Sequence, residues 1–310
     1  MKVRYSYLKQ QFSNSPDLWK KLKDFVDTGD FTLGKPLEIF EKKFAKLIGT
    51  KYAVGVNSGT DAIKLSLKTI GIKPGDEVIT AANTFVATVG AICELGAIPI
   101  FVDCDDSFCM DTSLVEKKIT KKTKAIVPVH FTGYMTDMIK LNKIAKKYNI
   151  PVVEDACQSI LASINKKNSG TWSDFGAFSL HPLKNINVWS DGGVIVTNSK
   201  KYYNHLRLLR NHGLVDRDNV AICGYNSRLD TFQAVVGNWL IPSAKKIANQ
   251  RIKNANYYDQ NLKNINEISI PPRIKNFKIV YHLYIIFAEN RDKLLEYCLK
   301  KGIEAKVHYP

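Results

Sequence analysis

Short apolar runs alternate with helix-length segments as far as Thr197, and this rhythm constrains the fold more than any other feature of the sequence. Most of the runs are continuous stretches of Val, Ile and Ala, which is typical of strands covered on both faces. We expect strands at residues 52–56, 77–80, 98–102, 125–130, 151–154, 175–180 and 193–197. We expect helices between them at residues 59–70, 85–95, 111–119 and 138–148. The pattern predicts an α/β fold with a mostly parallel, seven-stranded sheet between helices.

The end of this region departs from the rhythm. Only residues 181–192 separate the last two predicted strands, which is short for a helical crossover, so the final strand is expected to run antiparallel. Long helices are then expected at residues 200–212 and 231–262.

A small α+β unit is expected to follow, with a strand at 281–288, a helix at 291–301 and a strand at 303–308. We divide the chain into a large α/β domain with an N-terminal arm, residues 1–240, and a small C-terminal α+β domain, residues 241–310. The small domain is expected to be incomplete, because no closing helix follows its last strand.

Composition narrows the class of protein. The formal net charge is +16, but the lysines are scattered in patterns that amphipathic helices would expose, and no nucleic-acid motif occurs. No apolar run reaches the roughly 18 residues of a membrane helix, and the N-terminus lacks a signal-like apolar core. None of the six cysteines forms a CxxC pair. We therefore expect a cytoplasmic protein with reduced thiols and without metal, nucleic-acid or membrane binding.

Three segments contain candidate chemistry. Residues 57–61 (NSGTD) join a predicted strand to a predicted helix, where free N–H groups suit a phosphate, although the same residue types are ordinary helix caps. Asp155 follows Glu154 at the end of an apolar strand, where it could bind a metal, act as a base, pair with a protonated ring nitrogen or cap a helix. Lys184 lies in a loop among apolar residues, where desolvation could make it a nucleophile, although most loop lysines are surface charges.

Taken in order, these segments resemble the fold-type I enzymes that use pyridoxal 5′-phosphate (PLP), and in detail the DegT/DnrJ/EryC1/StrS family of sugar aminotransferases. The resemblance covers about residues 25–310, and Lys184 follows Asp155 by 29 residues. The matching stretches are residues 49–62 (GTKYAVGVNSGTDA), 74–88 (PGDEVITAANTFVAT), 96–103 (GAIPIFVD), 154–158 (EDACQ), 179–184 (SLHPLK), 191–197 (DGGVIVT), 210–213 (RNHG) and 224–233 (GYNSRLDTFQ).

The resemblance implies roles around the cofactor ring. Lys184 would bind the cofactor covalently and move a proton between the amino donor and the cofactor. Asp155 would pair with the ring N–H, which makes the ring a better electron sink. Gln158 would hydrogen-bond the phenolic oxygen, and Phe85 would stack on the ring, unless it is a core aromatic.

Further implied roles concern the phosphate. The backbone amides of Thr60 and Asp61 and the hydroxyl of Ser179 would hold it. Asn226 would reach it from the partner subunit, so that two active sites are shared in a homodimer.

The implied reaction passes an amino group from an amino acid, usually L-glutamate, through the pyridoxamine form of PLP to a keto-sugar. The sugar is usually a nucleotide-linked 3- or 4-keto hexose, and the products serve polysaccharide, lipopolysaccharide or glycan biosynthesis. Residues 181–193 also resemble a subgroup that forms an 8-amino octulosonate. A PLP-dependent sugar dehydratase is an alternative, because some relatives that dehydrate their sugar carry a histidine in place of the lysine. Here Lys184 fills the lysine position and His181 lies three residues earlier, which favours transamination. A basic, non-enzymatic binding protein is a third alternative.

Overall fold

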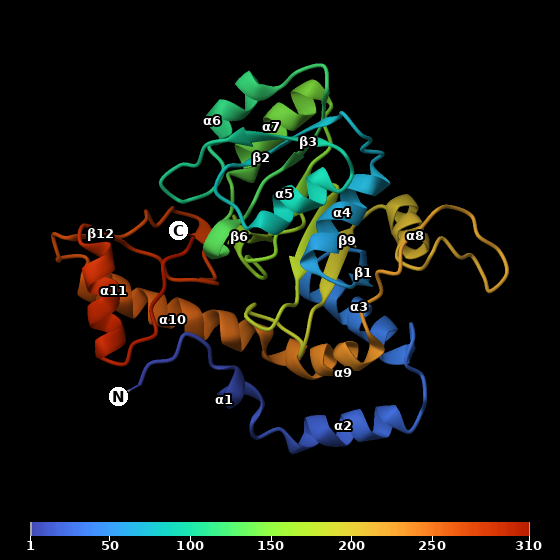
Figure 1. The fold of residues 1–310 in the computed structure, drawn as a ribbon, viewed down its shortest axis with the longest axis horizontal. Coiled ribbons are helices and arrows are strands. Elements are labelled where there is room, and N and C mark those ends of the chain that lie inside the picture. The colour runs from blue at the N-terminus through green and yellow to red at the C-terminus, as the bar shows by residue number, and fades with distance from the viewer. Residues whose placement is uncertain (1, 310) are drawn as a thin grey trace.

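The computed structural model describes residues 2–309, and the main strands of its α/β region form two neighbouring sheets (Figure 1). A four-stranded sheet has the order β1-β9-β8-β5, and a three-stranded sheet has the order β3-β2-β4. The strands are β1 (Tyr52–Val56), β2 (Glu77–Ala81), β3 (Ile98–Val102), β4 (Thr123–Val127), β5 (Val153–Asp155), β8 (Phe175–Ser179) and β9 (Gly193–Thr197). The expected α/β class is thus observed, but the expected single sheet of seven strands is not.

Proline explains the division between β4 and β5. The N–H of Ile126 donates to the carbonyl of Pro151 (3.1 Å), and the N–H of His130 donates to the carbonyl of Asp155 (3.0 Å). Pro128 lies midway between these two donors and has no N–H, so it cannot supply the bond between them. Among the described residues, the two sheets are therefore connected by isolated parallel bridges, at Ile126–Val152 and Val129–Asp155, rather than by a continuous ladder.

Strand directions are mixed. β2 pairs in parallel with β3 and β4, and β5 pairs in parallel with β8. β9 runs antiparallel to both β8 and β1, which confirms the expectation that the last strand reverses. The reversal brings the loop between β8 and β9 back to the same edge of the sheet.

Amphipathic helices cover the sheets. The helices of this region are α4 (Gly59–Thr69), α5 (Val86–Cys93), α6 (Thr112–Val115), α7 (Met138–Tyr148) and α8 (Lys200–Leu209), preceded by α1 (Leu8–Phe12), α2 (Pro16–Val26) and α3 (Lys35–Ile48). α3 packs against β1 and against α9 (Thr231–Leu240). α4 packs on β8 and β9, and the apolar side chains between these layers are fully buried.

The expected long helix at residues 231–262 is interrupted. α9 ends at Leu240, a short 3₁₀ helix spans Ile241–Ser243, and α10 (Ala244–Leu262) follows. Pro242 lies in this break, where it removes a helical N–H and clashes with the preceding turn.

The C-terminal region is less regular than expected. The helix expected at 291–301 is observed as α11 (Arg291–Lys300), but two-residue strands replace the strands expected at 281–288 and 303–308. β10 (Ile268–Ser269) pairs with β12 (Phe287–Ala288), whereas β11 (Phe277–Lys278) pairs with β6 (Ser163–Ile164), which also pairs with β7 (Lys167–Asn168). In Figure 1, the segment before α1 and the segment after α11 lie on the side that carries α10 and α11. A parallel bridge joins Val3 to Ile303 there.

None of the described helices is both long enough and apolar enough to cross a membrane. Within residues 2–309, no cluster of His, Cys, Asp or Glu has the arrangement of a metal site.

Candidate active site

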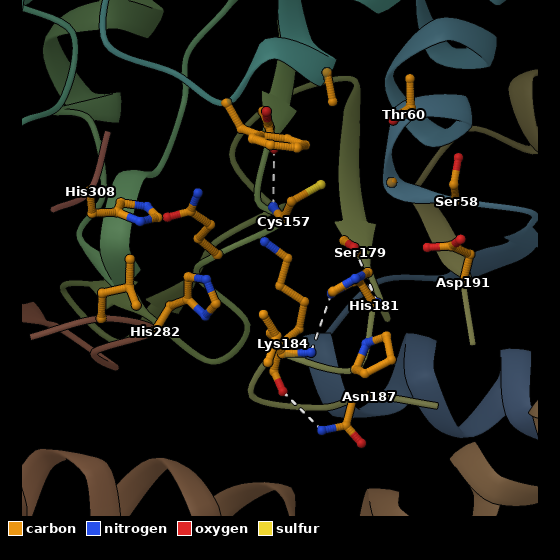
Figure 2. Close-up of a pocket in the computed structure, with 18 of the residues that line it drawn as sticks. Ser58, Thr60, Cys157, Ser179, His181, Lys184, Asn187, Asp191, His282 and His308 are labelled. Atoms are coloured by element: carbon orange, nitrogen blue, oxygen red, sulfur yellow. Dashed lines mark hydrogen bonds between the residues drawn. The ribbon is translucent and has the colours of Figure 1, made fainter. Parts of the chain in front are cut away.

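A cavity of about 290 Å³ opens at the carboxyl ends of β5 and β8 (Figure 2). The ends of parallel strands are the usual ligand-binding edge of an α/β sheet. Six of the eight residues selected from the sequence line this cavity, namely Thr60, Phe85, Asp155, Gln158, Ser179 and Lys184. Segments far apart in the chain complete the wall, from Tyr5 in the N-terminal arm to His308 near the C-terminus.

The N-terminus of α4 forms one end of the cavity. Ser58 caps the helix by accepting a hydrogen bond from the N–H of Asp61 (3.1 Å). The N–H groups of Gly59 and Thr60 precede the first intrahelical bond, and within the described residues no acceptor is recorded for them. A Cβ on Gly59 would lie 2.7 Å from the Cβ of Ser179, so only glycine allows β8 and the helix to approach this closely. This end of the cavity has the chemistry of an anion site.

Asp155 presents a buried carboxylate in the middle of the cavity. Its Oδ2 accepts a hydrogen bond from the hydroxyl of Thr88 (2.7 Å), and its Oδ1 accepts one from the N–H of Cys157 (3.1 Å). The carboxylate is therefore held by two donors and can accept a further proton donor from the cavity.

The neighbouring Glu154 has a different role from Asp155. It is fully buried away from the cavity, where it accepts hydrogen bonds from the N–H groups of Gly170 (2.7 Å) and Trp172 (2.8 Å). His130 lies 2.9 Å from it. Glu154 is thus a structural carboxylate, and only Asp155 of this pair faces the site.

Lys184 lies in the loop between β8 and β9 and points into the cavity between its two ends (Figure 2). Burial lowers the pKa of Lys184 from its usual value, although Cys157 and Asp155 oppose this shift. The backbone N–H of Lys184 donates to the carbonyl of His181 (2.8 Å), and the side chain of Asn187 donates to the carbonyl of Lys184 (3.1 Å). A fixed backbone and a lowered pKa suit a nucleophilic amine.

The other lining residues have one side fixed and one side open. The Oε1 of Gln158 accepts a hydrogen bond from the N–H of Thr132 (2.7 Å), which leaves its amide NH₂ as the donor toward the cavity. The Phe85 ring is half-exposed, with its centroid 6.0 Å from that of Tyr309. The Ser179 hydroxyl accepts a hydrogen bond from the N–H of His181 (3.2 Å).

Two of the selected residues do not line this cavity. The carboxylate of Asp61 turns away toward Lys64 (2.9 Å) and accepts a hydrogen bond from Ser227 (2.7 Å), and its N–H is engaged by Ser58. Asn226 is exposed and forms an antiparallel bridge with Asn211. The structure therefore brings neither of these side chains into the cavity of its own chain.

Other lining residues were not selected from the sequence. Thr88 binds Asp155, and the side chains of Arg251 and His282 come from the C-terminal region. Burial lowers the pKa of His282 well below its usual value, and the charges of Lys184 and Arg251 act in the same direction. Thr88 lies within a stretch that carries the family resemblance, but neither its spacing nor its residue type indicates its partner.

Cys157 also lines the cavity, beside Asp155. Burial raises the pKa of this thiol well above its usual value, and the negative charge of Asp155 acts in the same direction. The thiol therefore stays protonated and is a poor nucleophile.

The residues of the cavity fit PLP. The α4 N-terminus, cleared of a side chain at Gly59, matches a phosphate, Asp155 matches a protonated ring nitrogen, and the amine of Lys184, whose pKa is lowered, matches an aldehyde carbon. These are three different functional groups, and the cavity offers a complementary group for each.

Comparison with known proteins agrees with this chemistry. The family model described as the DegT/DnrJ/EryC1/StrS aminotransferase family matches residues 14–310. The UDP-N-acetyl-3-dehydro-α-D-glucosamine 3-aminotransferase of Acidithiobacillus ferrooxidans is 37% identical over 286 residues, which cover 92% of this chain and 77% of that protein.

Solved structures extend the comparison. DesV of S. venezuelae, solved with a ketimine intermediate, matches with a TM-score of 0.97 and 35% identity, over 100% of this chain and 84% of that one. NtdA of Bacillus subtilis, solved with bound pyridoxamine phosphate (PMP), matches with a TM-score of 0.89 and 32% identity, over 100% of this chain and 72% of that one. The chain therefore belongs to the DegT/DnrJ/EryC1/StrS aminotransferase family of PLP-dependent sugar aminotransferases.

Proposed function

We propose that this protein transfers an amino group from an amino acid, L-glutamate, to the keto group of a nucleotide-linked hexose at carbon 3 or 4. The observation that carries the proposal is the meeting of Lys184, Asp155 and the N-terminus of α4 in one cavity. The aminated sugar would be used in cell-surface polysaccharide, lipopolysaccharide or glycan biosynthesis.

Lys184 is the residue to which we assign the covalent link to the cofactor and the proton transfer. Its lowered pKa supports both roles, because the neutral amine is the nucleophile and the base. Bound PLP supplies a ring that withdraws electrons from the carbon losing its proton. Asp155 would keep the ring nitrogen protonated by accepting a hydrogen bond from its N–H, which maintains this electron withdrawal. Asn187 holds the backbone of Lys184, so the amine returns to the same position in each half-reaction.

We assign the phosphate to the α4 end of the cavity. The free N–H groups of Gly59 and Thr60 and the hydroxyl of Ser179 support this assignment. The N–H of Asp61 would join them when the Ser58 hydroxyl, which now accepts it, turns to the phosphate.

Ring binding is assigned to Phe85 and Gln158. The open face of Phe85 would stack on the cofactor ring, and the amide NH₂ of Gln158, which contacts Tyr309 in this structure, would donate to the phenolic oxygen.

Charge and similarity support a nucleotide-linked substrate. The chain has a formal net charge of +16, and the cavity wall includes Arg251, both of which suit an anionic diphosphate. The similar enzyme of A. ferrooxidans is named for a UDP-linked 3-dehydro sugar, which favours carbon 3.

We further propose a homodimer with shared sites, a PLP-binding domain at residues 1–240 and a small domain at residues 241–310. Asn226 is exposed, and the adjacent Ser227 is hydrogen-bonded to Asp61 on the helix that we assign to phosphate binding. The Asn226 side chain is therefore near this end of the site and available to contact the phosphate bound by a second subunit.

The break at Pro242 supports the domain boundary. All six cysteines are free, which supports a cytoplasmic location.

The experiment that tests this function uses ¹⁵N-labelled L-glutamate with UDP- and dTDP-linked 3-keto and 4-keto hexoses and an 8-keto octulosonate. Transfer of ¹⁵N to a nucleotide-linked sugar is the expected result, and transfer to the octulosonate alone would replace the proposed substrate. Loss of water from the sugar without ¹⁵N transfer would indicate a dehydratase. A folded protein that binds no PLP and acts on no sugar would contradict the enzymatic function.

A further inference from the structure

Two threonine hydroxyls form a chain that ends on the carboxylate of Asp155. The Oγ1 atoms of Thr84 and Thr88 lie 2.7 Å apart, and the Oγ1 of Thr88 lies 2.7 Å from the Oδ2 of Asp155. Thr88 is 1% exposed and Asp155 is 5% exposed, so water does not compete for the bond between them.

The direction of the chain follows from its last member. A carboxylate can only accept, so the hydroxyl proton of Thr88 is committed to Asp155. Thr88 must then accept a hydrogen bond from Thr84, whose hydroxyl proton points to Thr88 (2.7 Å) in preference to the more distant carbonyl of Phe85 (3.3 Å). Both hydroxyl dipoles therefore have their positive ends toward Asp155, which stabilises its negative charge.

Phe85 lies between the two threonines. Thr84 precedes Phe85, which is the extended N-cap residue of α5 (Val86–Cys93), and Thr88 lies in the first turn of that helix. The hydrogen bond between the two hydroxyls therefore ties the segment before the N-cap to the first helical turn, and the same short segment carries a ring-stacking residue and the support for Asp155.

We propose that Thr88, supported by Thr84, is a positioning residue that holds the carboxylate of Asp155 in place and aimed at the ring nitrogen of PLP. The inference rests on the proposed cofactor role of Asp155 and goes beyond it. With the Oδ2 of Asp155 stabilised by Thr88 and its Oδ1 by the N–H of Cys157, the proton shared with the ring stays on the ring nitrogen. The ring then keeps the positive charge on which its electron-withdrawing effect depends.

The test compares Thr88→Val, which keeps the shape and removes the hydroxyl, with Thr88→Ser, which keeps the hydroxyl. Thr84→Val removes only the outer member of the chain. Thr80→Val is the matched control, because Thr80 is also fully buried and its hydroxyl donates to a carbonyl (Val127, 2.9 Å), but it does not line the cavity. For each protein, the measurements are the Kd for PLP, the pH titration of the visible spectrum of bound PLP, and the melting temperature.

Thr88→Val is expected to bind PLP about tenfold more weakly, as for the loss of one hydrogen bond to a charged group. The midpoint of its spectral titration is expected to move to higher pH, because a less positive ring makes the lysine-linked proton harder to remove. Thr88→Ser should restore both values, and Thr84→Val should shift both in the same direction by a smaller factor. Thr80→Val should lower the melting temperature without changing the Kd or the titration.

A wild-type Kd and titration midpoint in Thr88→Val would overturn the inference, as would a lowered melting temperature without a shift in the titration. If Thr88→Val does not fold, an unshifted titration in Thr84→Val would overturn it. If the wild-type protein binds PLP in the same experiments, each of these results overturns the inference about Thr88 and leaves the proposed function standing. A wild-type protein that binds no PLP would overturn the proposed function and, with it, this inference.

Discussion

The side-chain amide of Asn187 joins Lys184 to the N-terminal arm. Its Nδ2 donates to the carbonyl of Lys184 (3.1 Å) and to the Oε1 of Gln11 in α1 (3.3 Å). The loop that carries the cofactor lysine is therefore fixed by a distant segment, since Gln11 and Asn187 are 176 residues apart in the sequence. The position of Lys184 thus depends on how the N-terminal arm docks.

Replacement of Asn187 tests this dependence. Asn187→Ala removes both bonds and should cost about 1 kcal/mol in the free energy of unfolding, with a lower PLP affinity because Lys184 is less well held. Asn168→Ala is the matched control, since its Nδ2 also donates to a carbonyl (Ile48, 2.9 Å) but does not contact the cavity. If both variants lose stability equally and bind PLP like the wild type, Asn187 has no role in positioning Lys184.

Gly59 tests the close approach of α4 to β8. A Cβ at this position would lie 2.7 Å from the Cβ of Ser179 and 2.9 Å from the Sγ of Cys157. Gly59→Ala should therefore displace the N-terminus of α4, destabilise the protein by about 1–3 kcal/mol and weaken PLP binding. The measurements are urea unfolding and titration with PLP.

Gly90 provides the opposite case. It lies within α5, and a Cβ there would have nothing within 4 Å. Gly90→Ala should stabilise the protein by about 0.5–1 kcal/mol, because alanine loses less backbone entropy in a helix, and it should leave PLP binding unchanged. Equal effects of the two substitutions would mean that the packing around Gly59 does not shape the site.

The order of strands and helices in the large domain is predictable from sequence, because each buried run contains its own signal of composition and length. The ladder interruption at Pro128 is less predictable. Pro128 is visible in the sequence, but the sequence does not show which strand lies beside it. The pairing of β4 with β5 is set by the tertiary structure. The short strands of the C-terminal region are also missed, because two-residue pairs such as Ile268–Ala288 leave no periodic pattern.

The candidate site divides in the same way. Lys184, Asp155 and the start of α4 follow strand ends, so the topology predicts that they meet, and the family resemblance adds Phe85, Gln158 and Ser179. Thr88 binds a residue 67 positions away, and its hydroxyl looks like that of any helical threonine. His282 reaches the cavity from a segment without regular structure, so its contribution is visible only in three dimensions.

His282 gives the stability of the protein a pH dependence. Its pKa is well below the usual 6.5 because it is buried near Lys184 and Arg251, so between these two pKa values the unfolded chain binds a proton that the folded chain does not. The corresponding stability is fully present above about pH 6.5 and is lost as the pH falls through the folded pKa.

His282→Gln should therefore reduce the loss of unfolding free energy between pH 7.5 and pH 5, by on the order of 1 kcal/mol. His205→Gln should have a smaller effect in the same direction, since burial lowers the pKa of that half-buried residue less strongly. Urea unfolding at both pH values gives the result, and the same pH dependence in His282→Gln as in the wild type would refute this assignment.

The central claim is that Lys184 carries the cofactor, and trapping tests it most directly. The protein is loaded with PLP, reduced with borohydride, digested and mapped by mass spectrometry. We expect the mass of the reduced cofactor on the peptide that contains Lys184, together with loss of the visible absorption band. Lys184→Ala should show neither the band nor the label while remaining folded. A cofactor label on a different lysine, or an unchanged visible band in Lys184→Ala, would contradict the account.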